Sequence, residues 1–319
     1  MEPKKSIAKP LHTYDPEVLS VYLKHHVSGF TGLAGLEKFS DGQSNPTYKI
    51  LDTSGASYVL RAKPPGKLLK SAHAVDREFR VMTALAETAV PVPKMLHLSG
   101  DDSPMGAQFF VMGYLSGTVF WDPALPKCSK SFRTLAYSAL VETLAALHEV
   151  DPHRVGLENF GRPGNYFGRQ VSRWTHQYRA SETQSRRDMD WTIDWLSQNL
   201  VKDDGQMSIV HGDYRLDNVM FDIHTPKMIA VLDWELSTLG HPFADLAYQC
   251  MGLRLPQDSL IKGLDTLDRT ALGIPDEAEY VAQYCALRSI ALPENWAFYM
   301  TFSFFRLAAI LEGVLHRAQ

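Results

Sequence analysis

The chain has 319 residues, 45% of them hydrophobic and 21% charged, which is typical of a soluble globular protein with a large core. The formal net charge of −4 gives no reason to expect a nucleic-acid partner. The three cysteines, Cys128, Cys250 and Cys285, match no metal-binding or disulfide spacing. This pattern favours buried thiols in a reducing compartment.

Residues 1–14 are predicted to be a flexible lead-in and do not have the apolar core of a signal peptide. Asp15 and Pro16 form a good helix start, for a helix extending to about His26. The apolar stretch 297–315 is interrupted by charged residues, which indicates a buried helix rather than a membrane span. We therefore expect a cytoplasmic protein that does not bind a membrane.

The next segments predict a small sheet with one helix. Residues 39–45 form a turn-rich loop, and residues 47–51 and 58–62 follow as paired strands. Residues 74–86 carry apolar side chains at helical spacing. Residues 108–112 then read as a buried strand that leads into Gly113–Gly117. Beyond Gly117 the pattern becomes helical, with a core helix over about 132–147.

Residues 166–187 form a basic, aromatic segment with five arginines and one acidic residue. Arg169 and Arg173 are predicted to share one face of a helix, as are Trp174 and Tyr178. Such a surface, which also includes Tyr166, favours an anionic acceptor with apolar parts over a polycation. A solvated basic helix face explains the same pattern equally well, and both interpretations remain open.

The most informative stretch is Ser208–Glu235, SIVHGDYRLDNVMFDIHTPKMIAVLDWE. Three short apolar runs separated by turn residues predict a small hairpin platform whose ends present Asp213, Asn218 and Asp233. Phosphoryl transfer requires a carboxylate that orients the acceptor hydroxyl and hard oxygen ligands that hold Mg²⁺. The order and spacing of these three residues match those of a kinase catalytic loop and its metal-binding aspartate.

The HGD…N and DWE motifs resemble the aminoglycoside phosphotransferase (APH) family, which has the protein-kinase-like fold. The resemblance implies a bilobal α+β protein. Residues 1–115 would form a small β-rich nucleotide-binding lobe, and residues 116–319 a larger helical lobe with the catalytic loop and acceptor site. It also implies ATP and Mg²⁺ as cofactors, with Asp213 as the base or hydroxyl-orienting residue and Asn218 and Asp233 as metal ligands. Asp245 would support the catalytic loop.

Arg215 has two interpretations, neutralising charge on the transferring group or forming a salt bridge with Asp217. In the smaller lobe the resemblance implies a set of nucleotide-binding residues: Gly42, Ser44, Asn45, Arg61, Glu78, Met112 and Tyr114. Arg61 stands where protein kinases have a phosphate-binding lysine, with Lys63 as the other candidate, and Glu78 would pair with that cation. Backbone groups at Met112–Tyr114 would bind adenine.

The segments NYFGRQVSRW and VLRAKPPGKLLKSAHAVDREFRVM are similar in sequence to the kinase-like domains associated with acyl-CoA dehydrogenases. That subgroup implies a hydroxylated acyl-CoA as acceptor, phosphorylated on a chain hydroxyl such as the 4-position, and a functional link to such a dehydrogenase. The aromatic residues of 296–305 would suit an acyl chain or simply form core. The alternatives are a nucleotide-binding pseudokinase, an antibiotic phosphotransferase of the aminoglycoside type and a metal-dependent hydrolase built on His211, Asp213 and Asp233.

Overall fold

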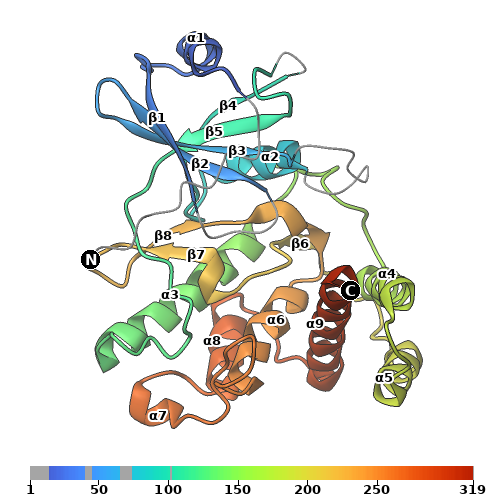
Figure 1. The fold of residues 1–319 in the computed structure, drawn as a ribbon. Coiled ribbons are helices and arrows are strands. Elements are labelled where there is room, and N and C mark those ends of the chain that lie inside the picture. The colour runs from blue at the N-terminus through green and yellow to red at the C-terminus, as the bar shows by residue number, and fades with distance from the viewer. Residues whose placement is uncertain (1–13, 40–44, 65–73, 101–102, 319) are drawn as a thin grey trace. The chain divides into compact units, whose positions relative to one another are not determined.

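The computed structural model describes residues 14–39, 45–64, 74–100 and 103–318 (Figure 1). The chain divides into an N-terminal unit, residues 1–86 and 92–116, and a C-terminal unit, residues 87–91 and 117–319. The first contains a five-stranded antiparallel sheet and the second is mostly helical, which confirms the predicted α+β class with a small β-rich part and a larger helical part.

The sheet of the N-terminal unit has the strand order β1-β2-β3-β5-β4, and all neighbouring pairs are antiparallel. The elements of this unit are α1 (Pro16–His26), β1 (Leu33–Lys38), β2 (Thr47–Asp52), β3 (Ser57–Ala62), α2 (Val75–Leu85), β4 (Met95–Leu98) and β5 (Phe109–Gly113). Asp15 caps α1 by accepting hydrogen bonds from the backbone of Glu17 and Val18, so the predicted helix start is confirmed.

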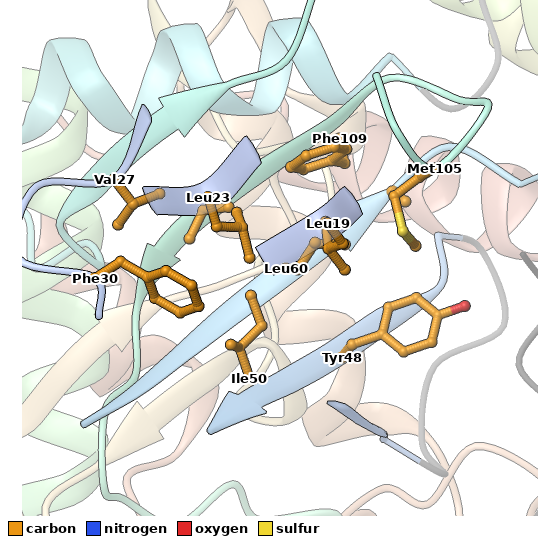
Figure 2. Close-up of a cluster of buried hydrophobic side chains, with 11 residues drawn as sticks. Leu19, Leu23, Val27, Phe30, Tyr48, Ile50, Leu60, Met105 and Phe109 are labelled. Atoms are coloured by element: carbon orange, nitrogen blue, oxygen red, sulfur yellow. The ribbon is translucent and has the colours of Figure 1, made fainter. Parts of the chain in front are cut away.

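Helices α1 and α2 cover opposite faces of this sheet. Leu19 and Leu23 of α1 pack in one cluster with Ile50, Leu60 and other buried side chains of β2, β3 and β5 (Figure 2). The alternation of side chains along β5 sends Phe109 into that cluster and Phe110 towards Phe79 of α2. Arg61 of β3 is the ladder partner of Phe110, so its side chain also faces α2.

The C-terminal unit is built around long helices and two short β-ladders. Its helices are α3 (Lys130–Glu149), α4 (Tyr166–Ser181), α5 (Arg187–Gln198), α6 (Phe243–Arg254), α7 (Arg269–Leu272), α8 (Glu277–Leu287) and α9 (Trp296–Ala318). Its strands are β6 (Ser208–Val210), β7 (Val219–Phe221), β8 (Met228–Val231) and β9 (Thr238–Gly240), with 3₁₀ turns at Leu216–Asn218 and Trp234–Leu236.

The predicted platform of three strands is wrong in one respect. β7 and β8 form the expected hairpin, but β6 pairs with β9, a strand that the sequence analysis does not predict. Gly212 has a φ of +83°, a conformation that glycine adopts without steric cost, and it redirects the chain after β6. The loop that follows β6 therefore lies between two ladders.

Helix α9 is long and apolar enough, by length and composition, to cross a membrane, with a mean hydropathy of 1.4. However, 56% of that apolar window is buried within the protein. The two charged side chains that interrupt it, Arg306 and Glu312, are themselves buried and hydrogen-bonded to other elements. These contacts are those of a core helix, as the interrupted pattern predicts.

Candidate active site

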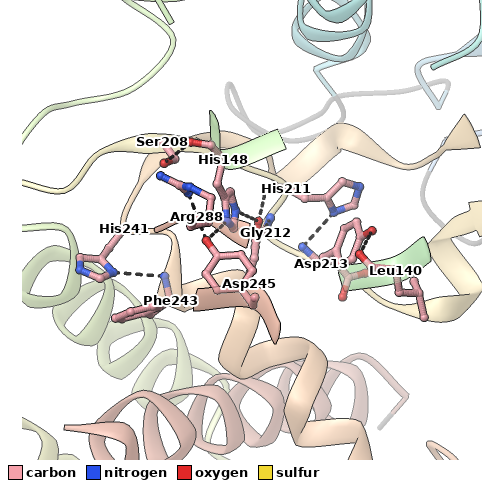
Figure 3. Close-up of polar contacts among 12 residues, drawn as sticks. Leu140, His148, Ser208, His211, Gly212, Asp213, His241, Phe243, Asp245 and Arg288 are labelled. Atoms are coloured by element: carbon pink, nitrogen blue, oxygen red, sulfur yellow. Dashed lines mark hydrogen bonds and ion pairs between the residues drawn. The ribbon is translucent and has the colours of Figure 1, made fainter. Parts of the chain in front are cut away.

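The loop of residues 211–218, here called the Asp213 loop, is anchored from below by one carboxylate (Figure 3). Asp245, in the first turn of α6, accepts hydrogen bonds from the backbone N–H groups of His211 (2.6 Å) and Gly212 (2.8 Å). The ring of His148 contacts the same carboxylate at 3.3 Å. The predicted supporting role of Asp245 is therefore confirmed.

The charge state of this anchor follows from its surroundings. Burial raises the pKa of the Asp245 carboxyl, but the hydrogen bonds that it accepts outweigh burial, so that pKa lies below its usual range. Burial lowers the pKa of His148 despite the carboxylate beside it. At neutral pH the His148 ring is therefore neutral and donates a hydrogen bond to the ionised carboxylate of Asp245. The anchor of the loop thus does not depend on a charged histidine.

His211 braces the loop from within. Its Nε2 lies 2.8 Å from the carbonyl of Leu232, and its Nδ1 lies 3.2 Å from the backbone nitrogen of Asp213. Since a carbonyl only accepts and an N–H only donates, the ring is a neutral imidazole with its proton on Nε2. Both ring nitrogens of His211 therefore form hydrogen bonds within the protein. Among the residues that the structure describes, no group of three or more His, Cys, Asp or Glu side chains could hold a metal ion.

The carboxylate of Asp213 is half-buried, with 22% of the side chain exposed, and is held from two sides. Asn218 donates from its amide nitrogen to the Asp213 backbone carbonyl and to Oδ2, both at 2.8 Å. Arg215 places its Nε 3.4 Å from Oδ1. Tyr248 of α6 forms a hydrogen bond with the same carboxylate. Burial, together with the charge and the hydrogen bond of Asp213, raises the pKa of this tyrosine.

Arg215 is shared between two carboxylates. Besides Asp213, its guanidinium forms a 2.8 Å ion pair with Asp217. Burial acts to lower the pKa of Arg215, but the two carboxylates outweigh it and raise that pKa. The predicted salt bridge to Asp217 is thus present, while the direct role in charge neutralisation stays a prediction.

Asp233 follows β8 and lies beside the Asp213 loop. The backbone N–H of Leu232 donates to the carbonyl of Asn218 at 2.8 Å, which brings the residues predicted to be metal ligands onto adjacent segments. Asp233 has φ +60° and ψ +61°, a left-handed conformation that is uncommon outside glycine, asparagine and aspartate. A carboxylate and an amide oxygen are hard donors of the kind that Mg²⁺ binds, so the residues present fit that ion.

In the N-terminal unit the predicted pairing of Arg61 with Glu78 is confirmed. The Nε of Arg61 lies 3.0 Å from Oε2 of Glu78, which is only 1% exposed. Asn45 donates to the other carboxylate oxygen at 2.8 Å, so its amide belongs to the support of Glu78. Lys63 instead contacts Asp76 at 3.5 Å, on the exposed start of α2.

Four other residues are predicted to contact the nucleotide. Gly42 and Ser44 lie outside the described residues. Met112 is the penultimate residue of β5, opposite Val59 and Met95 in the ladder. Tyr114 follows the strand and lies 37% exposed, with the ammonium of Lys49 4.5 Å from the centre of its ring.

Replacing Glu78 by Ala is expected to destabilise the N-terminal unit by about 3 kcal/mol, because a half-buried guanidinium would lose its carboxylate partner. The matched control is Asp76→Asn, which removes the half-exposed partner of Lys63 and should cost about 0–1 kcal/mol. Urea unfolding followed by circular dichroism measures both. Equal small effects would mean that the Arg61–Glu78 pair contributes no more than a surface contact.

The basic segment forms α4, and the structure separates its arginines. Arg169 donates to the backbone carbonyls of Arg162 (2.6 Å) and Pro163 (3.2 Å), so it holds the preceding loop. Arg179 and Arg186 pair with carboxylates. Arg173 is exposed, and its guanidinium lies 5.6 Å from the ring centre of the adjacent Trp174.

The aromatic partners predicted for the acceptor are largely buried. Tyr166 packs so closely on Gly240 that a Cβ there would lie 2.5 Å from its ring. Burial raises the pKa of Tyr166 to about 12. Trp174 is 8% exposed, and its indole N–H has no hydrogen-bond partner among the described residues. Of the predicted set, Arg173 is therefore the side chain most accessible to an acceptor.

The aromatic side chains of 296–305 are mainly core. Phe298, Tyr299 and Phe302 pack around Phe167 of α4. An apolar groove of about 440 Å³ does lie between α5 and α9, lined in part by Phe304 and Ala308. At about 100° per residue these positions project from the side of α9 opposite Arg306, which contacts the Asp213 loop. This groove therefore does not belong to the Asp213 site.

Two residues at the site are absent from the sequence-based predictions. Tyr248 follows Asp245 by three residues on α6, so the spacing for one helix face could have identified it. Arg306 is a buried charge within an apolar helix, and its guanidinium donates to the carbonyl of Gly212. Its departure from the apolar pattern was the available signal, but nothing in the sequence indicates which segment it contacts.

The model of the phosphotransferase enzyme family (APH) matches residues 35–296. Acyl-CoA dehydrogenase family member 10 of Mus musculus is 46% identical over 304 residues, which is 95% of this chain and 28% of that protein. The chain thus spans less than a third of that relative's length.

Solved structures of phosphotransferases confirm the predicted kinase-like fold. The crystal structure of a candidate aminoglycoside phosphotransferase from Ralstonia eutropha has a TM-score of 0.87 and 46% identity, covering 96% of this chain and 90% of that one. A mutant of the aminoglycoside phosphotransferase APH(4)-Ia, in a ternary complex with ADP and hygromycin B, has a TM-score of 0.60 at 14% identity. It covers 94% of this chain and 95% of the other, and at this identity the likeness shows the fold alone.

Proposed function

Because the chain belongs to the phosphotransferase enzyme family, we propose that it transfers the γ-phosphoryl group of ATP to an alcohol hydroxyl of a small molecule. The observation that carries this proposal is the geometry of the Asp213 loop. The half-buried carboxylate of Asp213 is held by Asn218 and Arg215, on a loop whose backbone is fixed by Asp245 and His211. Positioning and electrostatic stabilisation are the main contributions of a protein to phosphoryl transfer.

Asp213 is the residue that orients the acceptor. Its carboxylate would accept a hydrogen bond from the acceptor hydroxyl and take up that proton as the oxygen–phosphorus bond forms. The bond between the γ-phosphorus and the bridging oxygen breaks, and ADP leaves. Arg215, held by Asp213 and Asp217, adds fixed positive charge beside the carboxylate.

Asn218 and Asp233 would hold Mg²⁺. The amide nitrogen of Asn218 is committed to Asp213, which directs its amide oxygen as the group left for a cation. When bound, the ion would neutralise the phosphate charge of the nucleotide. In the N-terminal unit, the burial of Glu78 and its contact with Arg61 favour Arg61 over Lys63 as the phosphate-binding cation.

The acceptor class that we propose is a hydroxylated acyl-CoA. Two observations support it: a relative at 46% identity is named an acyl-CoA dehydrogenase family member, and α4 carries an accessible arginine. A guanidinium favours phosphates and other anions and disfavours the cationic aminoglycosides. The proposed link to an acyl-CoA dehydrogenase rests on the same relative.

Replacing Arg173 by Ala tests this acceptor class. A lost charge-assisted contact is worth about 1.5–3 kcal/mol, so we expect the KM for a hydroxyacyl-CoA to rise at least about tenfold. Arg173→Glu should raise it further, since repulsion adds to the loss. The KM for ATP should stay near that of the unmodified protein. Steady-state kinetics with a coupled ADP assay measures all three constants.

The control is Arg187→Glu, which makes the same change of charge at an exposed position in the same basic segment. It should leave the KM for the acyl-CoA unchanged. Arg169 is left intact, because its removal would release the loop carbonyls that it holds. Rapid phosphorylation of aminoglycosides by the unmodified protein, with none of hydroxyacyl-CoAs, would reject this acceptor class in favour of antibiotic phosphorylation.

A further inference from the structure

Arg306 is a buried cation in the middle of α9, with 5% of the residue exposed. No carboxylate lies within ion-pair distance of it in the described part of the chain. Its Nε has no hydrogen-bond partner there either. A buried charge without a counter-ion is costly, so its presence calls for a compensating interaction.

Two aromatic rings supply part of that compensation. The guanidinium carbon lies 4.8 Å from the ring centre of Tyr248 on α6 and 5.3 Å from that of Trp174 on α4. Cation–π contacts of this kind stabilise a desolvated guanidinium without neutralising its charge. They also fix the direction of the group, because contacts with two rings on different helices restrict its rotation.

The direction so fixed is towards the Asp213 loop. A terminal nitrogen of Arg306 donates to the carbonyl oxygen of Gly212. The N–H at the other end of that peptide, on Asp213, donates to His211, and the N–H of Gly212 donates to Asp245. Every polar backbone group between Gly212 and the Asp213 side chain is therefore held.

Glycine makes this restraint necessary. Gly212 is required because a Cβ at this position would lie 2.6 Å from the carbonyl oxygen of Leu236. Glycine also has the most conformational freedom of any residue. A rotation of the Gly212–Asp213 peptide would swing the carboxylate of Asp213, so the loop needs a partner for the Gly212 carbonyl.

We propose that Arg306 is a positioning residue for phosphoryl transfer, which sets the orientation of Asp213 through the carbonyl of Gly212. This inference rests on the proposed function. Its effect lies on the chemical step rather than on nucleotide binding, because the guanidinium contacts the backbone behind the carboxylate. Tyr248 shares the arrangement, since it contacts both Arg306 and Asp213.

The same helix offers a matched control. Glu312 of α9 is also buried, at 6% exposure, but it accepts hydrogen bonds from Thr183 and pairs with Arg186 at 3.6 Å. These partners connect α9 to the segment between α4 and α5 and do not touch the Asp213 loop. A change at Glu312 therefore reports the cost of disturbing a buried charge on α9 without disturbing Asp213.

The experiment compares Arg306→Met, Arg306→Lys and Glu312→Gln with the unmodified protein. A misplacement of about 1 Å can cost on the order of 10²-fold in rate, so Arg306→Met should lower kcat by about 10–100-fold with the KM for ATP unchanged. Lysine should restore part of kcat. Glu312→Gln should lower Tm and leave kcat near the unmodified value. A kcat loss in Glu312→Gln that matches Arg306→Met at equal loss of Tm would overturn the positioning role.

A second readout does not need activity. Hydrogen exchange at the amides of Gly212 and Asp213 should accelerate in both Arg306 variants and stay unchanged in Glu312→Gln. Unchanged exchange in Arg306→Lys despite a reduced kcat would reject the inference even if Arg306→Met failed to fold. Absence of phosphotransfer by the unmodified protein would reject the proposed function, while faster exchange at these amides would still support the restraint by Arg306.

Discussion

The Asp213→Asn protein is expected to bind ATP with near-normal affinity and to transfer the phosphoryl group about 10²–10⁴-fold more slowly, the range typical of general acid–base catalysis. The substitution keeps the size of the side chain and the oxygen that accepts from Asn218. It removes the charge that faces Arg215 and the capacity to take a proton from the acceptor. Single-turnover kinetics separates this chemical step from binding.

The control for this prediction is Asp217→Asn. Asp217 shares Arg215 with Asp213 and is similarly buried, with 23% of its side chain exposed. Burial raises the pKa of its carboxyl, despite the arginine beside it. If the loss at Asp213 came only from disturbing Arg215, both variants would be slowed equally. Near-normal turnover in Asp213→Asn would remove Asp213 from the mechanism.

Replacement of Asp233 is expected to abolish the Mg²⁺-dependent part of nucleotide affinity. Substitutions of outer-sphere partners of a metal typically cost about 10–100-fold in affinity, so loss of a direct anionic ligand should cost at least that much. The left-handed backbone at this position decides which variant to use. Glycine removes the carboxylate without strain, whereas alanine would add a conformational penalty of about 1–2 kcal/mol.

Asparagine at position 233 is the companion variant, because it tolerates the left-handed conformation and keeps one oxygen without the charge. Isothermal titration calorimetry with and without Mg²⁺ should rank the affinity for Mg·ATP as unmodified protein, Asp233→Asn, Asp233→Gly. Affinity for ATP in the absence of Mg²⁺ should be the same in all three. An unchanged affinity for Mg·ATP in Asp233→Gly would place the metal on other residues.

The sequence predicts the side chains that would take part in the chemistry better than the strand pairing and backbone contacts that hold them in place. The sequence predicts roles for Asp213, Asn218 and Asp233 because their types and spacing follow from the chemistry, and for Asp245 because of its place in the family. The pairing of β6 with β9 was missed because strands of three residues carry almost no periodic signal.

The contacts of Arg306 illustrate a further limit. Its carbonyl partner, Gly212, lies 94 positions earlier in the chain, and backbone acceptors leave no trace in residue type. The opposite error affects Arg169, whose charge suggests a ligand although its donors are used by two carbonyls of the preceding loop. In both cases the deciding contact is with backbone atoms, which a sequence pattern cannot display.

We propose that this chain phosphorylates the hydroxyl of an anionic small molecule at Asp213. The most direct measurement incubates the unmodified protein with ATP, Mg²⁺ and a 4-hydroxyacyl-CoA, and follows the products by ³¹P NMR and mass spectrometry. We predict a phosphate ester on the acyl chain, formed together with ADP and strongly reduced with Asp213→Asn. Hydrolysis of ATP without an ester on any hydroxyl acceptor, or ester formation at the same rate by Asp213→Asn, would contradict this proposed function.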